Sequence, residues 1–392
     1  MTRSDLRAFL LKGVLVVAVN LLLLEALLQL LYWVTSGGGW LAARVSPPIY
    51  AFNPKLGIYG LRPDFTYRHK TSEFNVPIAI DGRAMRVAGD ASRTAAPGSK
   101  SFDGLTVLAS GPSYGFGWGS PYQEAYYPRM AALLGQRLGL PVRLLNISVP
   151  SQSSGLQLCR LQQEMAADRP DLVMITVYGG LQNLEPRCRK DSSLQVWNHQ
   201  LVSGRPTLAS RLKGLLRQSA IVFYSYSVYG ALAGPGSSAA PMGQQDYRSQ
   251  SDAQPLPQIE AYAAAVRRSL GPVSLLFVRV PYAYQVHPDH LARWRSNASP
   301  AVLAAQAAGE AAAWRQLRSD QAVLQRNGIF LLDPVPALQA QAGRGKQLYY
   351  RVDTHFTPAG NAVVAESLAR DPGLPALLAD VRRHRAASGR QP

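Results

Sequence analysis

The chain has 392 residues, which is enough for one large domain or two ordinary domains with a sizeable hydrophobic core. Hydrophobic residues at 47% and charged residues at 17% fit a globular protein with one membrane segment and exclude a multi-span transporter, which would need many long apolar runs. The net charge of +17 favours anionic neighbours such as phospholipid head groups or acidic polysaccharide. Because no nucleic-acid-binding motif of the usual kinds accompanies this charge, we expect no nucleic-acid partner.

An apolar run near the N-terminus, residues 13–34, is long enough to cross a hydrocarbon core of ~30 Å as a helix. Basic residues precede it within residues 1–12, so the positive-inside rule predicts a cytoplasmic N-terminus and an extracytoplasmic remainder. We therefore predict a single-pass protein of the cytoplasmic (inner) membrane whose main domain is periplasmic. A cleaved signal peptide is the alternative, although its apolar region would ordinarily span about 7–15 residues.

Glu25 is the one formally charged residue in this apolar run. A carboxylate is costly in lipid, which makes Glu25 a candidate contact with a membrane partner helix. The other interpretation is a protonated or snorkelling side chain without a partner.

Residues 35–104 are predicted to form a connector followed by a small β-unit. Phe65 to His69 and Phe74 to Ile80 are rich in the β-branched and aromatic residues typical of strands. Asp81 and Gly82 then supply a turn signal.

Residues 105–380 are predicted to form the main α/β domain. Short apolar runs there have the length and composition of strands in the middle of a parallel sheet: Leu105 to Ala109, Val142 to Val149, Leu172 to Tyr178, Val273 to Val280 and Gly328 to Asp333. Segments with helical spacing of apolar residues separate them: Tyr127 to Leu138, Ser154 to Ala167, Tyr262 to Leu270 and Ala301 to Gln325. This alternation predicts a doubly wound parallel sheet flanked by helices.

Two segments, one within the predicted α/β domain and one after it, have a biased composition. Residues 230–257 are rich in Gly, Ser, Pro and Gln and are predicted to be a flexible surface loop. Residues 381–392 carry several arginines and are predicted to be a solvated basic tail.

Cys159 and Cys188 are the two cysteines of the chain. An extracytoplasmic compartment permits a disulfide between them, and two unpaired buried thiols are the alternative. The six histidines do not cluster with cysteines or carboxylates, so we predict no metal site and no cofactor.

The first candidate for chemistry is the glycine-rich turn that follows the strand ending at Ala109. Its sequence, SGPSYGFGWG, places Ser113 in the middle of the turn. Glycines let the chain turn sharply and bring bare backbone close to a substrate. The hydroxyl of Ser113 could be exposed there, while its own N–H points at an oxyanion. A glycine-rich turn without chemistry is the alternative.

The second candidate is the segment YYRVDTHFTPAGN, which holds Asp353 and His355 just before a predicted helix. Thr357 and Pro358 are suited to the N-cap and the first position of that helix. In an extended segment, residues two apart project to the same side, so the Asp353 carboxylate could hold the imidazole of His355 in one tautomer. The other ring nitrogen could then take the proton of a serine nucleophile.

Together the two segments resemble the blocks of the SGNH/GDSL hydrolase superfamily, which has a GDSxxxGxG-like block after its first strand and a DxxH or DxH block before its last helix. The matching positions are Gly111 to Gly119 and Asp353 to Gly360, in the family's order. The segments FNPKLGIYGLRPDF, DGRAMR and VRVPYAYQVHP are similar to parts of membrane-linked members. The resemblance runs from about Phe52 to the C-terminal helix.

The resemblance implies an SGNH/flavodoxin-like fold and a serine esterase, acylhydrolase or O-acyltransferase that acts on an acyl ester or polysaccharide of the cell envelope. Ser113 would be the nucleophile, His355 the general base and acid, and Asp353 the residue that orients the imidazole. The N–H groups of Ser113 and Ser151, together with the side chain of Asn183 or Gln182, would hold the oxyanion.

The chain departs from the family pattern in three places. Pro112 stands where the family has the aspartate before the serine, and Ser151 stands where it has the glycine after N-x-x-x-P. Asn183 comes about two positions later than the family's oxyanion asparagine. Because one lost oxyanion donor typically costs ~10²–10³ in rate, the alternative function is a catalytically weakened SGNH-fold protein that binds envelope glycan or a membrane partner.

Overall fold

The computed structural model describes residues 3–36, 47–71, 73–89, 102–178, 185–190, 193–203, 208, 212, 216, 219–225, 258–287, 321–351 and 353–390. Outside these residues lie the predicted loop at 230–257, much of the predicted connector and most of the predicted helix at 301–325.

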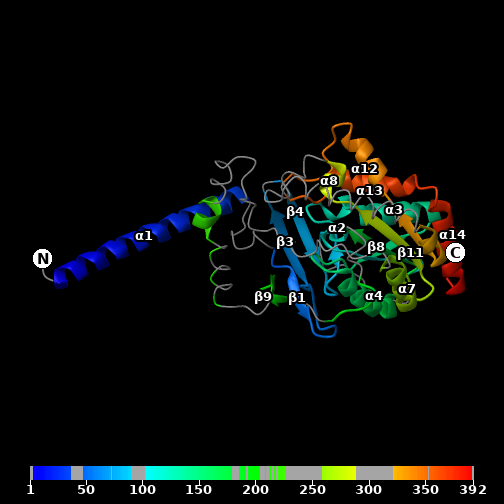
Figure 1. The fold of residues 1–392 in the computed structure, drawn as a ribbon, viewed down its shortest axis with the longest axis horizontal. Coiled ribbons are helices and arrows are strands. Elements are labelled where there is room, and N and C mark those ends of the chain that lie inside the picture. The colour runs from blue at the N-terminus through cyan, green and yellow to red at the C-terminus, as the bar shows by residue number, and fades with distance from the viewer. Residues whose placement is uncertain are drawn as a thin grey trace.

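Helix α1 (Arg3–Ser36) contains the apolar run predicted from the sequence. Within the described ranges, it is the one helix long and apolar enough to cross a membrane, over Phe9–Val34; a signal sequence has the same properties. Its apolar side chains are mostly exposed, and Figure 1 shows α1 as a long rod that extends away from the sheet and its flanking helices.

An eight-stranded sheet with the order β12-β11-β8-β6-β7-β5-β4-β3 forms the centre of the α/β part. Its parallel strands are β6 (Leu105–Ser110), β7 (Val142–Asn146), β8 (Leu172–Tyr178), β11 (Ser274–Val280) and β12 (Ile329–Leu332). Their order is that of a doubly wound, flavodoxin-like sheet, in which functional groups collect beyond the carboxyl ends of the strands. The fold class predicted from the sequence is confirmed.

Helices cover both faces of the parallel strands (Figure 1). One face packs against α3 (Tyr126–Leu138), α12 (Val335–Ala342), α13 (Pro358–Ala369) and α14 (Leu374–Ala387). The other packs against α4 (Ser154–Asp168), α7 (Gln258–Leu270) and α11 (Gln321–Arg326). Short helices lie in the connections: α2 (Ser113–Phe116), η3 (Tyr122–Glu124) and α8 (Ala283–Val286).

The predicted small β-unit continues the same sheet. Strand β4 (Asn75–Ile80) is antiparallel to both β3 (Phe65–Lys70) and β5 (Arg86–Val87), and Arg86 of β5 pairs with Asn146 of β7. Two separate hairpins are formed by β1 (Tyr50–Asn53) with β2 (Ile58–Leu61) and by β9 (Leu194–Trp197) with β10 (Gln200–Ser203).

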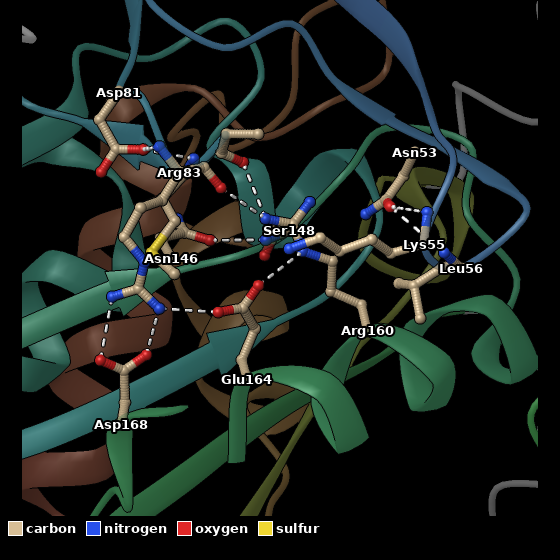
Figure 2. Close-up of polar contacts among 12 residues, drawn as sticks. Asn53, Lys55, Leu56, Asp81, Arg83, Asn146, Ser148, Arg160, Glu164 and Asp168 are labelled. Carbon is tan, nitrogen blue, oxygen red and sulfur yellow. Dashed lines mark hydrogen bonds and ion pairs between the residues drawn. The ribbon is translucent and has the colours of Figure 1, made fainter. Parts of the chain in front are cut away.

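A charged cluster fastens the turn between β4 and β5 to helix α4 (Figure 2). The carboxylate of Asp81 accepts the N–H of Arg83 at 2.9 Å, which closes the turn predicted at this position. The guanidinium of Arg83 pairs with Asp168 and, at 2.8 Å, with Glu164. Arg160 of the same helix donates to the backbone carbonyl of Arg83 at 3.0 Å. These contacts fix the antiparallel strands relative to the parallel sheet.

Cys159 of α4 forms a disulfide with Cys188. Of the two interpretations open from the sequence, the structure has the paired form, and the bond ties residues 185–190 to the helix.

The C-terminal segment differs from the predicted basic tail. Helix α14 extends to Ala387, and the guanidinium of Arg385 is fully buried. Arg385 pairs with the equally buried Asp171 at 3.0 Å and donates to the carbonyl of Gly104 at 2.8 Å. Since a buried cation is tolerated when it is paired and hydrogen-bonded, this arginine is part of the core rather than of a solvated tail.

Candidate active site

The glycine-rich turn after β6 packs closely against neighbouring strands. A Cβ atom added to Gly111 would lie 2.6 Å from the Oγ1 of Thr176, and one added to Gly115 would lie 2.7 Å from the Oγ of Ser148. Both positions therefore need glycine. This packing sets Ser113, the first residue of α2, directly beyond the carboxyl end of β6.

Asn146, the last residue of β7, also contacts the glycine-rich turn that follows β6. The Asn146 side chain donates to the carbonyl of Gly115 at 2.9 Å and accepts the N–H of Ser148 at 3.1 Å. Beyond Asn146 the strand ends earlier than predicted, although the N–H of Val149 still donates to the carbonyl of Gly111 at 3.0 Å. The side chain of Asn146 thus links two strand ends that meet at the site.

The segment before α13 turns rather than extends. Thr354 has a φ of 65°, in the left-handed region, and its N–H donates to the carbonyl of Tyr350 at 3.2 Å. The expectation of an extended segment with Asp353 and His355 on one side is therefore wrong in its backbone geometry, yet the turn brings these two side chains together. The predicted N-cap is present, since the Thr357 side chain accepts the N–H of Gly360 at 3.2 Å.

Ser113, His355 and Asp353 form one hydrogen-bonded chain. The Nε2 of His355 lies 2.6 Å from the Oγ of Ser113, a residue 242 positions away in the sequence. The Nδ1 of His355 lies 2.6 Å from the Oδ1 of Asp353. The imidazole and the carboxylate are each 20% exposed, so a substrate can approach without the site being fully hydrated.

The charge state of Asp353 determines which atom donates and which accepts in each of these hydrogen bonds. Burial raises the pKa of the Asp353 carboxyl, but the neighbouring His355 and the hydrogen bonds from His355 and Trp118 lower it more, so this pKa lies below its ordinary value. An ionised carboxylate only accepts hydrogen bonds. Nδ1 of His355 must then carry the proton, which leaves Nε2 to accept the hydroxyl proton of Ser113.

Two side chains that the sequence reasoning did not single out support the carboxylate. The indole Nε1 of Trp118 donates to the Oδ2 of Asp353 at 3.2 Å. The carboxylate of Glu73 accepts the backbone N–H of Arg351 at 2.6 Å and that of Asp353 at 2.7 Å. Trp118 stands in the glycine-rich turn and could have been considered from its position; nothing local in the sequence points to Glu73.

A buried histidine lies behind these residues. His69 of β3 packs edge-on against the rings of Trp118 and Phe74, with centroids 4.6 and 4.9 Å apart. Burial lowers the pKa of His69 from its ordinary 6.5 to about 4, and the opposing effect of Asp353 is smaller. His69 is therefore neutral at neutral pH and adds no charge beside the carboxylate.

The oxyanion candidates are described only in part. Ser151 has a φ of 65°, so it adopts the left-handed backbone that glycine would take most easily. Gln182 and Asn183 lie outside the described residues. The described ranges contain no group of three or more His, Cys, Asp or Glu side chains placed to hold a metal ion.

A serine, a histidine and an aspartate joined in this order at the carboxyl edge of a doubly wound sheet define a hydrolase-type α/β domain. Residues 242–383 match a family model described as "SGNH hydrolase-like domain, acetyltransferase AlgX". The matched range contains Asp353 and His355, whereas Ser113 precedes it. The match identifies an SGNH hydrolase-like domain in the C-terminal part of the chain.

Several solved structures are similar to the chain at low sequence identity. TesA is 18% identical, with 70% of this chain and 99% of TesA covered and a TM-score of 0.33. The acetylxylan esterase Axe2 of Geobacillus stearothermophilus, solved as a catalytic mutant, is 12% identical, with 69% and 95% covered and a TM-score of 0.36. A G-D-S-L family lipolytic protein of Veillonella parvula is 9% identical, with 68% and 97% covered and a TM-score of 0.33. No curated protein matches the chain.

Proposed function

We propose that the chain is a membrane-anchored serine esterase or O-acyltransferase that acts on an ester of the cell envelope. The observation that carries the proposal is the hydrogen-bonded chain from Ser113 through His355 to Asp353. A hydroxyl is a weak nucleophile until a neighbouring base takes its proton, and the Nε2 of His355 stands within hydrogen-bond distance of the Ser113 hydroxyl.

The reaction would proceed through an acyl-enzyme. The Oγ of Ser113 attacks the acyl carbonyl while its proton passes to Nε2 of His355, and the resulting oxyanion is held by backbone N–H groups, with those of Ser113 and Ser151 as candidates. His355 then gives this proton to the departing alkoxide. Water or a sugar hydroxyl attacks the acyl-enzyme next, loses its proton to Nε2, and Ser113 recovers that proton as it leaves.

Three observations support an anchored, extracytoplasmic placement. Helix α1 is long and apolar enough to cross a membrane, and basic residues precede its apolar part. The Cys159–Cys188 disulfide is of the kind that persists in oxidising compartments. Glu25 of α1 is bonded to residues 219–221, a contact that cleavage after the apolar run would remove.

Short acyl esters offered to the full chain in detergent test the catalytic proposal. Ser113→Ala removes the nucleophile and is expected to lower ester hydrolysis by ~10³-fold or more, since loss of the serine in such a triad abolishes most of the catalysis. Ser367→Ala is the matched control, because the Ser367 hydroxyl donates a hydrogen bond to the carbonyl of Val363 within α13. Equal rates for Ser113→Ala and the unchanged chain would refute the assignment.

Hydrolysis and transfer differ in the molecule that takes the acyl group from the acyl-enzyme, which is water in hydrolysis and a sugar hydroxyl in transfer. With a donor acetyl ester and an envelope polysaccharide present, a hydrolase releases free acetate, whereas a transferase yields acetylated glycan. Quantifying both products from one reaction decides between the two.

A binding function without catalysis is the second candidate, favoured by Pro112 and Ser151 standing where the family has aspartate and glycine. A serine-reactive fluorophosphonate probe separates the two. Labelling that disappears in Ser113→Ala supports the enzyme, and absence of labelling on a folded chain supports the binding protein.

A further inference from the structure

The carboxylate of Glu25 is bound by a distant part of the same chain. It accepts hydrogen bonds from the hydroxyl of Ser219 at 2.8 Å and from the backbone N–H groups of Ala220 at 2.7 Å and Ile221 at 3.0 Å. The side chain of Gln29, one turn along α1, donates at 2.8 Å. The partner sought for this residue from the sequence is thus supplied within the chain.

Apolar side chains extend this contact toward the end of α1. Tyr32, 3% exposed, and the fully buried Ala220 form a small cluster of their own, against which Leu28 and Phe223 pack. The rings of Tyr32 and Phe223 meet edge to face with centroids 6.3 Å apart. Residues 220–225 are helical, and Figure 1 shows this green helical stretch lying against the C-terminal part of α1.

The contact lies at a depth that lipid would occupy. Glu25 precedes Val34, the end of the membrane-length stretch, by nine residues, which is ~13 Å along a helix. A hydrocarbon core is ~30 Å thick, so Glu25 falls inside its outer half. A carboxylate there is costly unless it is paired or hydrogen-bonded, and residues 219–221 provide the donors.

Three exposed leucines, each in helical conformation, precede this contact in the chain. Leu208, Leu212 and Leu216 are 83%, 57% and 49% exposed and are all helical. A spacing of four residues places them on one helix face. The intervening sequence supplies Arg211, Lys213 and Arg217. Leucines on one face with Lys and Arg between them are the pattern of a segment that lies in a membrane surface carrying anionic lipid.

We propose that the part of the chain containing Leu208, Leu212, Leu216 and residues 219–225 is a second membrane-seated segment. It docks on α1 through Glu25, and its leucines are covered by outer-leaflet lipid. This inference rests on the anchored placement proposed above and adds to it that the chain returns to the bilayer after its anchor.

Depth measurements on the full chain in vesicles of phosphatidylcholine and phosphatidylglycerol test the inference. Both native cysteines are paired, so a cysteine introduced by Leu212→Cys can be labelled alone with an environment-sensitive fluorophore. Val34→Cys reports on the anchor, and Lys55→Cys, on an exposed turn, is the matched control outside the membrane. Quenching by lipids that carry a nitroxide on the acyl chain is the readout.

We expect quenching at position 212 to approach that at position 34 and to exceed that at position 55 several-fold. If the label at position 34 is quenched but the label at position 212 is quenched no more than the label at position 55, this inference is overturned and the anchor stands. Labels at 34 and 212 that both behave like the label at 55 would overturn the anchor as well.

Glu25→Ala tests the docking itself. It removes the acceptor of all the hydrogen bonds described for this carboxylate. The thiol introduced by Phe223→Cys is therefore expected to react faster with a water-soluble maleimide. Unchanged reactivity at position 223 in Glu25→Ala would show that Glu25 does not hold the segment. The melting temperature of the α/β domain, which lies apart from this contact, serves as the folding control.

Discussion

His69 is buried beside Trp118 with its pKa lowered to about 4. Above pH 6.5 it is neutral in the folded and the unfolded chain and does not affect stability. Between pH 6.5 and about 4 the unfolded chain binds a proton that the folded chain does not, so the free energy of unfolding falls as the pH falls. The loss amounts to about 3 kcal/mol once the pH is below the folded value.

Replacing His69 by phenylalanine keeps an aromatic ring between Trp118 and Phe74 and removes the titration. We expect urea unfolding of His69→Phe to depend less on pH between 4 and 6.5 than that of the unchanged chain. The same pH dependence in both would mean that His69 is not the source.

Glu73 holds the turn that carries Asp353 through two backbone N–H groups. Glu73→Gln keeps the shape but replaces one acceptor oxygen by an NH₂ group that faces a donor. We expect kcat for ester hydrolysis to fall by about 10- to 100-fold, because small displacements of catalytic groups cost that much, with little change in KM. Glu366→Gln, at an exposed ion pair with Arg370 on α13, is the control and should have no effect.

Individual residues of the candidate site were predictable where a short sequence motif contains them. Ser113, Asp353 and His355 stand in recognisable blocks, and Thr357 precedes a proline at a helix start. Glu73 and His69 were not predictable, since they reach the candidate site only because β3 and β4 extend the sheet past the turn that carries Asp353. The left-handed Thr354 was missed because threonine gives no sign of that conformation.

At the scale of elements, the turn after β6 depends on the absence of a side chain at Gly111. Gly111→Ala would place a methyl group 2.6 Å from the Oγ1 of Thr176, and we expect it to destabilise the fold by about 1–3 kcal/mol, the usual cost of overpacking. Thermal unfolding measures this. Gly343→Ala is the control, because the nearest atom to its added Cβ is 3.4 Å away. An equal melting temperature for both variants would contradict the packing argument.

The parallel strands were predictable because each is a short, mostly apolar run between segments with helical spacing. The antiparallel strands were predicted as strands but not as part of the same sheet. Their attachment depends on the Arg86 to Asn146 pairing and on the contacts of Arg83 with α4, which join residues far apart in the sequence. A sequence pattern describes a segment, and pairings of this kind are decided by which segments fit together.

At the scale of the whole molecule, the Cys159–Cys188 disulfide closes a loop with a sequence separation of 29. In the chain-entropy account, such a cross-link stabilises the fold by about 3–4 kcal/mol. We expect a reductant to lower the melting temperature of the unchanged chain and to leave Cys188→Ala unaffected. Hydrolysis at low temperature should survive reduction, because the bond does not touch the triad. Equal melting curves with and without reductant would contradict this.

The burial of Arg385 against Asp171 is another whole-molecule property that composition did not reveal. A cluster of arginines near a C-terminus is ordinarily solvated. Here α14 packs on the sheet, and the carboxylate of Asp171 at the start of β8 receives one of these arginines. This buried pair removes one positive and one negative charge from the surface together, so the net charge of the chain is unaffected while one arginine becomes part of the core.

The hydroxyl of Ser113 and the imidazole of His355 meet across 242 positions of sequence. Under the proposed mechanism, no shorter stretch of the polypeptide contains both ends of the proton path, so a chain that still lacks its last helices would be chemically silent. Esterase activity would switch on only when the last helices have docked. Turnover of a fluorogenic ester would then report the meeting of these two distant parts of the chain directly.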